Sequence, residues 1–327
     1  MTTLVTGSSG FVGSALCAAL LARGDEVIGV DRRPPDIPQG SGFRFAATDV
    51  TQPGAIEAAF DLAPIDRVVI GAAITADRAR EARDPATIVA VNVGAVAETL
   101  RCAAARGVGR VVHLSSAAVY GDNGCTVPVL DEDATPPAPA SLYAITKLAG
   151  ERTALRLGDV FGLDVVAGRL GTCFGPFEHD TGARDTLSPP WQVLQHARAG
   201  VPVSLPRAGR KDWLYSRDAV AAIIALLDAP RPLPRRLYNL GAGFEWSMAE
   251  WCEAIGRLHP GFTWSIGPDA NVDFYGDLDR SSLSNVNLLR DTGFVPRFDL
   301  NRALADYLEA EPVRPTPHAP TGIAAPQ

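Results

Sequence analysis

Three residues, Ser116, Tyr143 and Lys147, are of types that together could move a proton during the oxidation of an alcohol. Tyr143 and Lys147 stand four positions apart, so on a helix they share one face, where the ammonium group favours the phenolate form of the tyrosine. A phenolate can take the proton of a secondary alcohol as hydride leaves the carbon. Ser116 could hold the same oxygen by a hydrogen bond. A solvated helix face has the same spacing by chance, so the surrounding motifs decide between the two interpretations.

A glycine-rich turn lies between a strand-like run at residues 3–6 and a helical pattern at residues 11–23. Glycines at such a turn let a pyrophosphate approach the unpaired N–H groups of a helix N-terminus. The spacing is Gly-x-x-Gly-x-x-Gly, which simple packed turns also show. The expected contacts of the pyrophosphate are Gly7, Ser9, Gly10, Phe11, Val12 and Gly13.

Asp31 ends the second strand-like run, where a carboxylate can accept hydrogen bonds from the hydroxyls of an adenosine ribose. The carboxylate repels a 2'-phosphate, so the sequence favours NAD over NADP. Arg32, a further expected cofactor contact, and Arg33 partly offset that repulsion.

Other expected cofactor contacts follow later strands. Asp49 and Val50 could meet the adenine, although Asp49 could equally cap the helix expected at 54–62. Ala72 and Ser115 are also expected to contact the cofactor.

The elements that must position these residues alternate along the first half of the chain. Short β-branched runs lie at 3–6, 26–30, 43–45, 67–70 and 110–114, and helical patterns lie at 11–23, 54–62, 85–106 and 141–157. This alternation predicts right-handed crossovers and a mostly parallel sheet with helices on both faces. The expected fold class is α/β, a Rossmann-type doubly wound parallel sheet.

The second half of the chain departs from this alternation. Strand-like runs at 213–215 and 236–240 flank a helical run at 218–227, and helices are expected at 191–199, 247–258, 284–291 and 299–310. The expected N-caps of the last three helices are Ser247, Ser284 and Asp299.

This organisation predicts two interleaved domains. Residues 1–170, with segments near 211–242, are expected to form an NAD-binding Rossmann domain. Residues 171–210 and 243–310 are expected to form a smaller C-terminal substrate lobe, and the proline-rich tail, 311–327, is expected to be disordered.

Composition excludes several classes of protein. The chain has 327 residues, of which 46% are hydrophobic and 20% charged, as in ordinary globular proteins. Its net charge of -7 argues against a nucleic acid partner. Five separated cysteines without a CxxC motif predict free thiols and a cytoplasmic location. Apolar runs are too short for a membrane span, and no basic leader precedes the first strand.

The motifs together resemble those of the extended short-chain dehydrogenase/reductases, the NAD-dependent epimerase/dehydratase family. Besides the glycine turn, the matching segments are 92–94, 115–121, 143–147, 169–176, 211–220 and 238–241. The resemblance implies that Ser116, Tyr143 and Lys147 form a catalytic triad. Tyr143 and Lys147 are also expected to contact the cofactor, with Lys147 holding the nicotinamide ribose. It places Asn92 near the cofactor and active site, where a helix-cap role is the alternative. It also implies a homodimer paired through helices at 92–106 and 141–157.

Three departures from the family pattern narrow the expected chemistry. Ala117 and Ala118 stand where the family's 4,6-dehydratases carry an acidic pair, so dehydration is disfavoured. Thr172 replaces an asparagine that contacts substrate phosphate in many nucleotide-sugar epimerases, and the run 273–277 lacks their arginine before Gly-Asp. These losses weaken the case for a nucleotide-linked sugar. The cations that could substitute are Arg210, Lys211 and Arg280.

Substrate contacts are expected from two regions. Beside the catalytic residues these are Ser116, Ala117 and Thr172. In the polar loop at 177–185, His179 and Arg184 could meet hydroxyls or a carboxylate, although a solvated charged loop is the alternative. No metal is expected, because His179 has no set of partners at metal-ligand spacing.

The expected function is NAD-dependent hydride transfer at a secondary alcohol of a sugar-like substrate. The expected enzyme is an epimerase of a sugar or a nucleotide-sugar, in which the keto intermediate is retained and reduced on its other face; a dehydrogenase is the alternative. A ketone that leaves gives a dehydrogenase of a free sugar, sugar acid or other small hydroxylated molecule. A non-catalytic NAD-sensing scaffold ranks last, because Ser116, Tyr143 and Lys147 are all present.

Overall fold

The computed structural model describes residues 1–37, 40–274, 276 and 279–310. The tail that we expect to be disordered, 311–327, lies outside the described residues.

Seven parallel strands form the central sheet, in the order β12-β7-β5-β4-β1-β2-β3. They are β1 (Thr2–Thr6), β2 (Glu26–Asp31), β3 (Phe43–Ala47), β4 (Arg67–Ile70), β5 (Arg110–Ser116), β7 (Val165–Leu170) and β12 (Leu237–Leu240). The winding reverses between β1 and β4, and doubly wound sheets bind ligands in the crevice at the carboxyl ends of such strands. The predicted fold class is confirmed.

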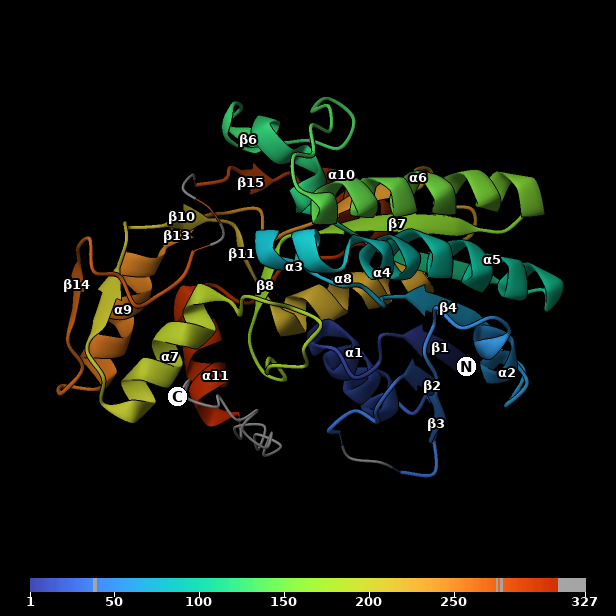
Figure 1. The fold of residues 1–327 in the computed structure, drawn as a ribbon, viewed down its shortest axis with the longest axis horizontal. Helices are drawn as coiled ribbons and strands as arrows, with labels where there is room; N and C mark the ends of the chain where they lie inside the picture. The colour runs from blue at the N-terminus through green and yellow to red at the C-terminus, as the bar shows by residue number, and fades with distance from the viewer. Residues whose placement is uncertain (38–39, 275, 277–278, 311–327) are drawn as a thin grey trace, which may run out of the picture.

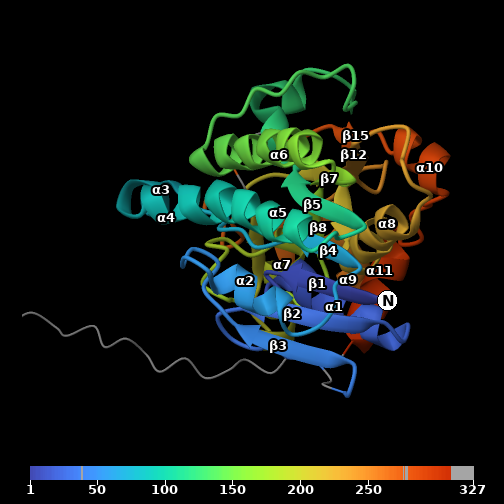
Figure 2. The same ribbon diagram turned by 90° about the vertical axis from the view of Figure 1, so that its right-hand side faces the viewer.

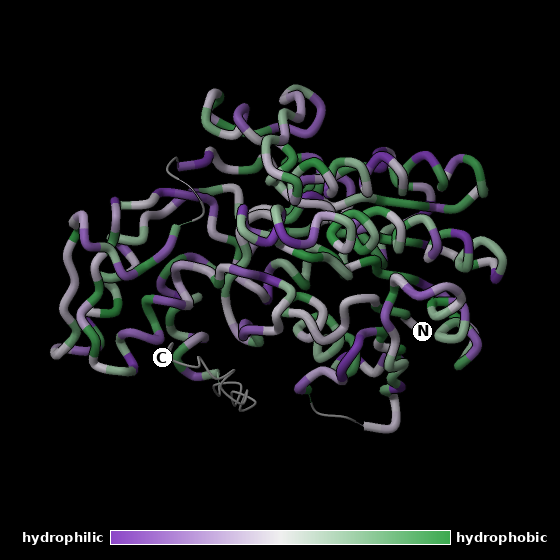
Figure 3. Tube along the Cα trace, viewed as in Figure 1, coloured by the Kyte–Doolittle hydropathy of each residue, from purple (hydrophilic) through white to green (hydrophobic). Residues whose placement is uncertain are grey.

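Helices cover both faces of the sheet (Figures 1 and 2). On one face lie α1 (Phe11–Ala22) and α8 (Ser216–Asp228), and on the other lie α2 (Ala55–Phe60), α5 (Ala95–Ala105) and α6 (Leu142–Phe161). Adjacent strand residues point to opposite faces, so Val5 packs toward α1 and Leu4 toward α5. Figure 3 shows the resulting apolar stretches along the central strands.

The helix expected at 85–106 is interrupted. It consists of α4 (Pro85–Val89), a π-helical turn (Ala90–Gly94) and α5. By length and composition the segment Pro85–Ala105 could cross a membrane. In this fold it is a partly buried segment packed against α6 and β4.

A second group of elements surrounds an aromatic core. Its helices are α7 (Pro189–Ala199), α9 (Met248–Leu258) and α11 (Leu300–Glu309), and its short strand pairs are β8 (Thr172–Phe174) with β11 (Trp213–Tyr215), β9 (Val203–Leu205) with β14 (Trp264–Ile266), and β10 (Arg210–Lys211) with β13 (Trp246–Ser247). Phe174, Trp246 and Trp251 meet there at ring-centroid distances of 5.2 to 5.5 Å. In Figure 1 this group lies to the left of the sheet.

Two of the three expected N-caps are confirmed. Ser247 forms a reciprocal capping box with Glu250, and Asp299 accepts a hydrogen bond from the Arg302 N–H. The cap expected at Ser284 is wrong, because α10 (Val286–Thr292) begins after Asn285. Ser284 instead extends the pairing of β15 (Ser282–Leu283) with β6 (Val129–Leu130), donating its N–H to the Leu130 carbonyl.

Two short elements near the site were not expected from the sequence. They are α3 (Arg78–Arg83), which follows β4, and a 3-10 segment (Ala117–Cys125), which follows β5.

Candidate active site

The glycine turn after β1 has the geometry that a bound pyrophosphate needs. Gly7 has φ +74°, and a Cβ there would lie 2.7 Å from the Ala72 nitrogen. A Cβ on Gly13 would lie 1.9 Å from the Gly7 oxygen. Helix α1 starts after Gly10, and within the described part of the chain no side chain caps it. The first N–H groups of α1 are therefore available to an anion.

Asp31 is held in place at the end of β2. One carboxylate oxygen accepts from the Ser9 N–H (3.1 Å) and the other from the Arg32 N–H (2.7 Å). A carboxylate has about four acceptor positions, so two remain for ribose hydroxyls. The Asp31 carboxylate thus fits the adenosine ribose of a dinucleotide, and the glycine turn fits its pyrophosphate.

Asp49 closes its own turn. Its Oδ1 accepts from the Thr51 N–H (2.9 Å) and hydroxyl (2.7 Å), and these bonds hold the pKa of Asp49 below its usual value. It does not cap the following helix, because α2 begins after Gly54. Val50 lies half-buried next to it.

The three proposed catalytic residues come from two neighbouring elements. Ser116 ends β5, and its Oγ accepts from the Ala118 N–H (3.1 Å). Tyr143 and Lys147 lie on α6, whose first turn is capped by Ser141 and by Glu81, which accepts from the Tyr143 N–H at 3.3 Å. Lys147 is buried and donates to the Leu114 carbonyl, two residues before Ser116.

The electrostatics of Lys147 combine two opposing effects. Burial lowers the pKa of Lys147 to about 8, and the carboxylate of Glu151, one turn further along α6, raises it. Glu151 itself is fully buried, accepting from Ser115 (2.8 Å) and from Arg169 on β7. Sequence reasoning missed Glu151, although its four-residue spacing from Lys147 was a usable signal.

Two of the expected cofactor contacts are enclosed by protein. Asn92 is buried in the π-helical turn, where its amide bonds Ile74 (2.8 and 3.1 Å) and the Thr146 hydroxyl (2.9 Å). The helix-cap alternative for Asn92 is therefore wrong, because the side chain links α6 to the segment after β4. Ser115 is likewise buried and bonded to Glu151.

The expected substrate contacts fall into two places. Ser116 and Ala117 lie together, and the Ala117 carbonyl accepts from Arg280 Nη1 (3.1 Å). Thr172 begins β8 and is half-buried. His179 is bonded through Nδ1 to the Phe177 carbonyl (2.9 Å).

Arg184, the remaining expected substrate contact, is bound within its own loop. Its Nη1 pairs at 2.9 Å with Glu178, a buried carboxylate that also accepts from the Ser188 N–H (2.7 Å) and hydroxyl (2.6 Å). Burial raises the pKa of Glu178.

The segment 181–185, which we call the strap, connects the loop after β8 to the nucleotide side of the fold. Thr75 donates to the Ala183 carbonyl (2.8 Å) and accepts from the Asp185 N–H (3.2 Å). Arg80 of α3 pairs with Asp185 at 3.0 Å. Near the end of β2, Arg33 donates to the Thr181 carbonyl (3.2 Å).

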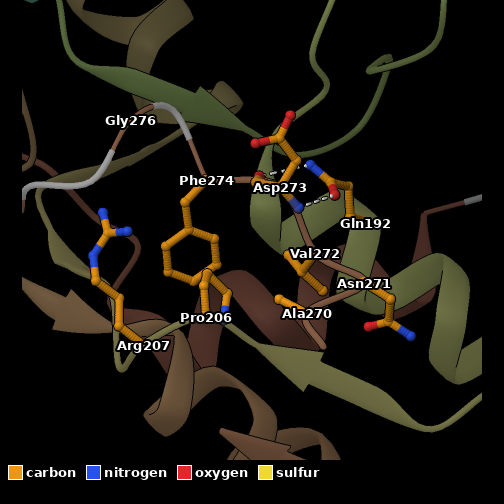
Figure 4. Close-up of a pocket in the computed structure, with 9 residues that line it drawn as sticks. All are labelled: Gln192, Pro206, Arg207, Ala270, Asn271, Val272, Asp273, Phe274 and Gly276. Atoms are coloured by element: carbon orange, nitrogen blue, oxygen red, sulfur yellow. Dashed lines mark hydrogen bonds between the residues drawn. The ribbon is translucent and has the colours of Figure 1, made fainter. Parts of the chain in front are cut away.

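A pocket of about 440 Å³ opens in the C-terminal lobe (Figure 4). Its lining includes Pro206, Arg207 and Phe274, and the Arg207 guanidinium lies 4.9 Å from the centre of the Phe274 ring. Gln192 and the backbone of Asp273 exchange hydrogen bonds of 2.8 and 3.0 Å at its rim. The pocket thus combines an aromatic face, a cation and amide groups.

Two further cations, Lys211 and Arg280, lie within electrostatic reach of each other near this part of the fold. Lys211 is buried on β10, and its pKa is lowered to about 8 by burial and then by the positive charges of Arg280 and Arg207. Lys211 thus lies within electrostatic reach of Arg207, which lines the pocket, and of Arg280, which donates to the Ala117 carbonyl. Sequence reasoning named Lys211 and Arg280 but missed Arg207.

The sequence pattern that describes the NAD dependent epimerase/dehydratase family matches residues 3–241. The chain belongs to this family. The family is NAD-dependent and consists of enzymes, so the predicted family, cofactor and enzyme class are confirmed.

Two named proteins align with most of this chain. UDP-glucuronate 4-epimerase 2 of Arabidopsis thaliana is 33% identical over 340 residues, which include 94% of this chain and 75% of that protein. UDP-glucose 4-epimerase of Mycolicibacterium smegmatis is 28% identical over 326 residues, 94% of this chain and 98% of that one.

Solved structures of epimerase/dehydratase proteins have the same fold. MoeE5 in complex with UDP-glucuronic acid and NAD aligns with a TM-score of 0.76 and 28% identity, over 94% of this chain and 98% of that one. UDP-glucuronic acid 4-epimerase of Bacillus cereus aligns with a TM-score of 0.80 at 22% identity over the same shares.

Proposed function

We propose that this member of the epimerase/dehydratase family is a nucleotide-sugar epimerase. The observation that carries the proposal is a group of three cations. Arg207 lines the pocket of Figure 4, Arg280 donates to the Ala117 carbonyl beside Ser116, and Lys211 lies within electrostatic reach of both. A nucleotide-sugar has parts in the matching order, namely a sugar, an anionic diphosphate and an aromatic base. The two relatives named 4-epimerases and the UDP-glucuronic acid complex of MoeE5 support the same substrate class.

In this proposal, Arg207 and Lys211 replace the asparagine and arginine that contact the diphosphate in many nucleotide-sugar epimerases. Phe274 stands in the run 273–277, where the family pattern leads one to expect an arginine. Arg207 stacks on that phenylalanine and is bonded to Asp279 (3.0 Å), so a guanidinium occupies the same region from another part of the chain. Lys211 adds a second positive charge. Both favour an anionic substrate.

The chain's own residues account for proton transfer. Tyr143 takes the proton of the substrate hydroxyl, Lys147 stabilises the phenolate by its charge, and Ser116 holds the reacting oxygen. NAD, when bound, supplies the hydride acceptor. After the keto sugar turns its other face toward the cofactor, the carbon would take back the same hydride on that face while Tyr143 returns the proton to the oxygen, and the configuration at that carbon is inverted.

The nucleotide side of the site is proposed as follows. Gly7, Gly10 and Gly13 with the first N–H groups of α1 would hold the pyrophosphate, and Asp31 the adenosine ribose, because their geometry fits these groups. The corresponding domain comprises residues 1–170 with the segments near 211–242, and the lobe formed by 171–210 and 243–310 would hold the substrate.

We further propose that the enzyme is a cytoplasmic homodimer. The five cysteines are free thiols, which supports a reducing compartment. Along α6, the apolar side chains of Ile145 and Val160 are 46% and 56% exposed, which supports pairing of this helix with a second copy.

The test has two steps. The purified protein is denatured and the released nucleotide identified by mass and absorbance; near-stoichiometric NAD or NADH supports a cofactor retained through turnover. UDP-glucose and UDP-glucuronic acid are then incubated with the enzyme, and inversion of the sugar is followed by proton NMR, with Tyr143→Phe as the inactive control. Stoichiometric NADH formation from free sugars, without inversion of either nucleotide-sugar, would establish the dehydrogenase instead.

A further inference from the structure

Arg280 is a cation whose guanidinium bonds the residue next to Ser116. Its Nη1 donates to the carbonyl of Ala117, the residue after Ser116. Among the residues that the structure describes, no Asp or Glu lies within 4.0 Å of its guanidinium. A guanidinium has five N–H donors, so one bond to a carbonyl leaves most of its capacity unused.

Arg280 is half-buried, and the three arginines that are buried in the described part of the chain each have a carboxylate partner. Arg110 pairs with Asp164 at 2.7 Å, Arg169 with Glu151 at 2.8 Å and Arg67 with Asp228 at 2.6 Å. Each of these pairs offsets the cost of removing a charge from water. For Arg280, the cost of removing the charge from water appears as a lowered pKa of its guanidinium.

The surroundings of Arg280 restrict where an anionic partner would lie. Burial lowers the pKa of Arg280, and the charges of Cys125, Asp122 and Tyr143 oppose that shift, so these three groups lie within electrostatic reach of the guanidinium. Ala117 and Ala118 follow Ser116 without a charged side chain of their own, and Asp122 is the carboxylate whose charge acts on Arg280. An anion bound there would be attached near the reacting carbon. The diphosphate of the same substrate would lie toward Lys211 and Arg207.

We propose that Arg280 is a specificity-determining residue that binds the carboxylate of a uronic acid, so that the preferred substrate is a nucleotide-linked uronate. A carboxylate on the ring carbon next to the reacting carbon would reach Arg280 while Tyr143 and Ser116 hold the reacting hydroxyl. A guanidinium binds a planar carboxylate by two parallel hydrogen bonds, which a neutral hydroxymethyl group cannot make. This inference rests on the proposed epimerase function and extends it to one class of sugar.

The experiment compares UDP-glucuronic acid with UDP-glucose on wild type, Arg280→Gln and Arg280→Lys. For Arg280→Gln we expect kcat/KM for the uronate to fall about 10- to 100-fold, and that for the neutral sugar to change less than about threefold. Arg280→Lys keeps the charge without the paired donors, so its loss should be intermediate. Arg290→Gln, at an exposed arginine of α10, is the matched control and should leave both substrates unchanged.

Binding is measured separately in Tyr143→Phe, where turnover is removed. Stronger thermal stabilisation by UDP-glucuronic acid than by UDP-glucose, lost on adding Arg280→Gln, supports the inference. Equal losses for both sugars would assign Arg280 to the shared diphosphate and overturn it, as would a wild-type preference for UDP-glucose. Absence of inversion with any nucleotide-sugar would refute the epimerase function itself, while the binding comparison would still report on Arg280.

Discussion

Glu151 and Arg169 form a two-bond ion pair that is closed off from solvent beneath the catalytic helix. Oε2 lies 2.9 Å from Nε and Oε1 lies 2.8 Å from Nη2, and the side chains are 0% and 1% exposed. The pair joins α6 to β7, and its carboxylate also faces Lys147. A single contact therefore supports both the fold and the charge of the proposed catalytic lysine.

Replacing Glu151 with Gln should destabilise the protein by about 3–5 kcal/mol, because Arg169 would be left as a buried uncompensated charge. Urea unfolding measures the change. Ser115→Ala is the control, since it removes one hydrogen bond to the same carboxylate and should cost about 1 kcal/mol. Equal losses of unfolding free energy in the two variants would show that the ion pair stabilises the protein no more than a single hydrogen bond does.

Activity should fall as pH rises through about 8, the pKa that burial gives Lys147. Below that pH the ammonium stabilises the Tyr143 phenolate, and above it the lysine is neutral and the stabilisation is lost. The charged or titratable groups facing Lys147 are Glu151 on α6, which opposes the shift, and His113 on β5, whose pKa burial holds well below its usual value. A kcat profile from pH 6 to 10 at saturating substrate tests this, and a profile that stays flat to pH 10 would contradict it.

Gly13→Ala should abolish NAD binding, because the new Cβ would lie 1.9 Å from the Gly7 oxygen and displace the turn. Gly256→Ala is the matched control on helix α9, where the nearest atom to a new Cβ is 4.0 Å away. That variant should bind NAD normally and gain up to about 1 kcal/mol of stability. Calorimetric titration with NAD and thermal unfolding distinguish the two; normal binding by Gly13→Ala would show that the turn does not hold the cofactor.

Arg80→Gln should speed the release of NAD several-fold, because it removes the 3.0 Å ion pair that holds Asp185 of the strap to α3. Release is measured by dilution of the loaded enzyme and detection of free nucleotide over time. Arg78→Gln, at an exposed position of the same helix, serves as the control. Unchanged release from Arg80→Gln would mean that the strap does not retain the cofactor.

The elements that carry the expected nucleotide contacts could be predicted because their signals are local. The spacing of Tyr143 and Lys147 is a property of one helix, and the glycine turn joins one strand to the next helix. The alternation of β-branched runs with helical patterns was enough for the doubly wound fold. The interruption of the helix at 85–106 escaped prediction because it depends on a tertiary contact, the bonding of Asn92 to Ile74 and Thr146.

The substrate side could not be predicted to the same depth because its residues come from distant segments. Arg280 reaches Ala117 across 163 positions, and Arg207 contacts Phe274 from a different loop. Arg184 has the charge to bind a substrate, but its pairing with Glu178 becomes visible only when the loop is folded. The residue types indicated which side chains could bind a substrate, but only the structure shows which group each of these side chains bonds.

The strap has a further consequence for the proposed epimerase. Its contacts run from Arg33, close to Asp31, to Arg80 on α3, so in the proposed epimerase the strap would slow the exit of a nucleotide bound beside it. One nucleotide molecule then serves many catalytic cycles, and each cycle returns it to the oxidation state in which it started. The conversion of one sugar into its stereoisomer would thus be independent of the cellular ratio of NAD to NADH, and its direction would depend only on the concentrations and relative stabilities of the two sugars.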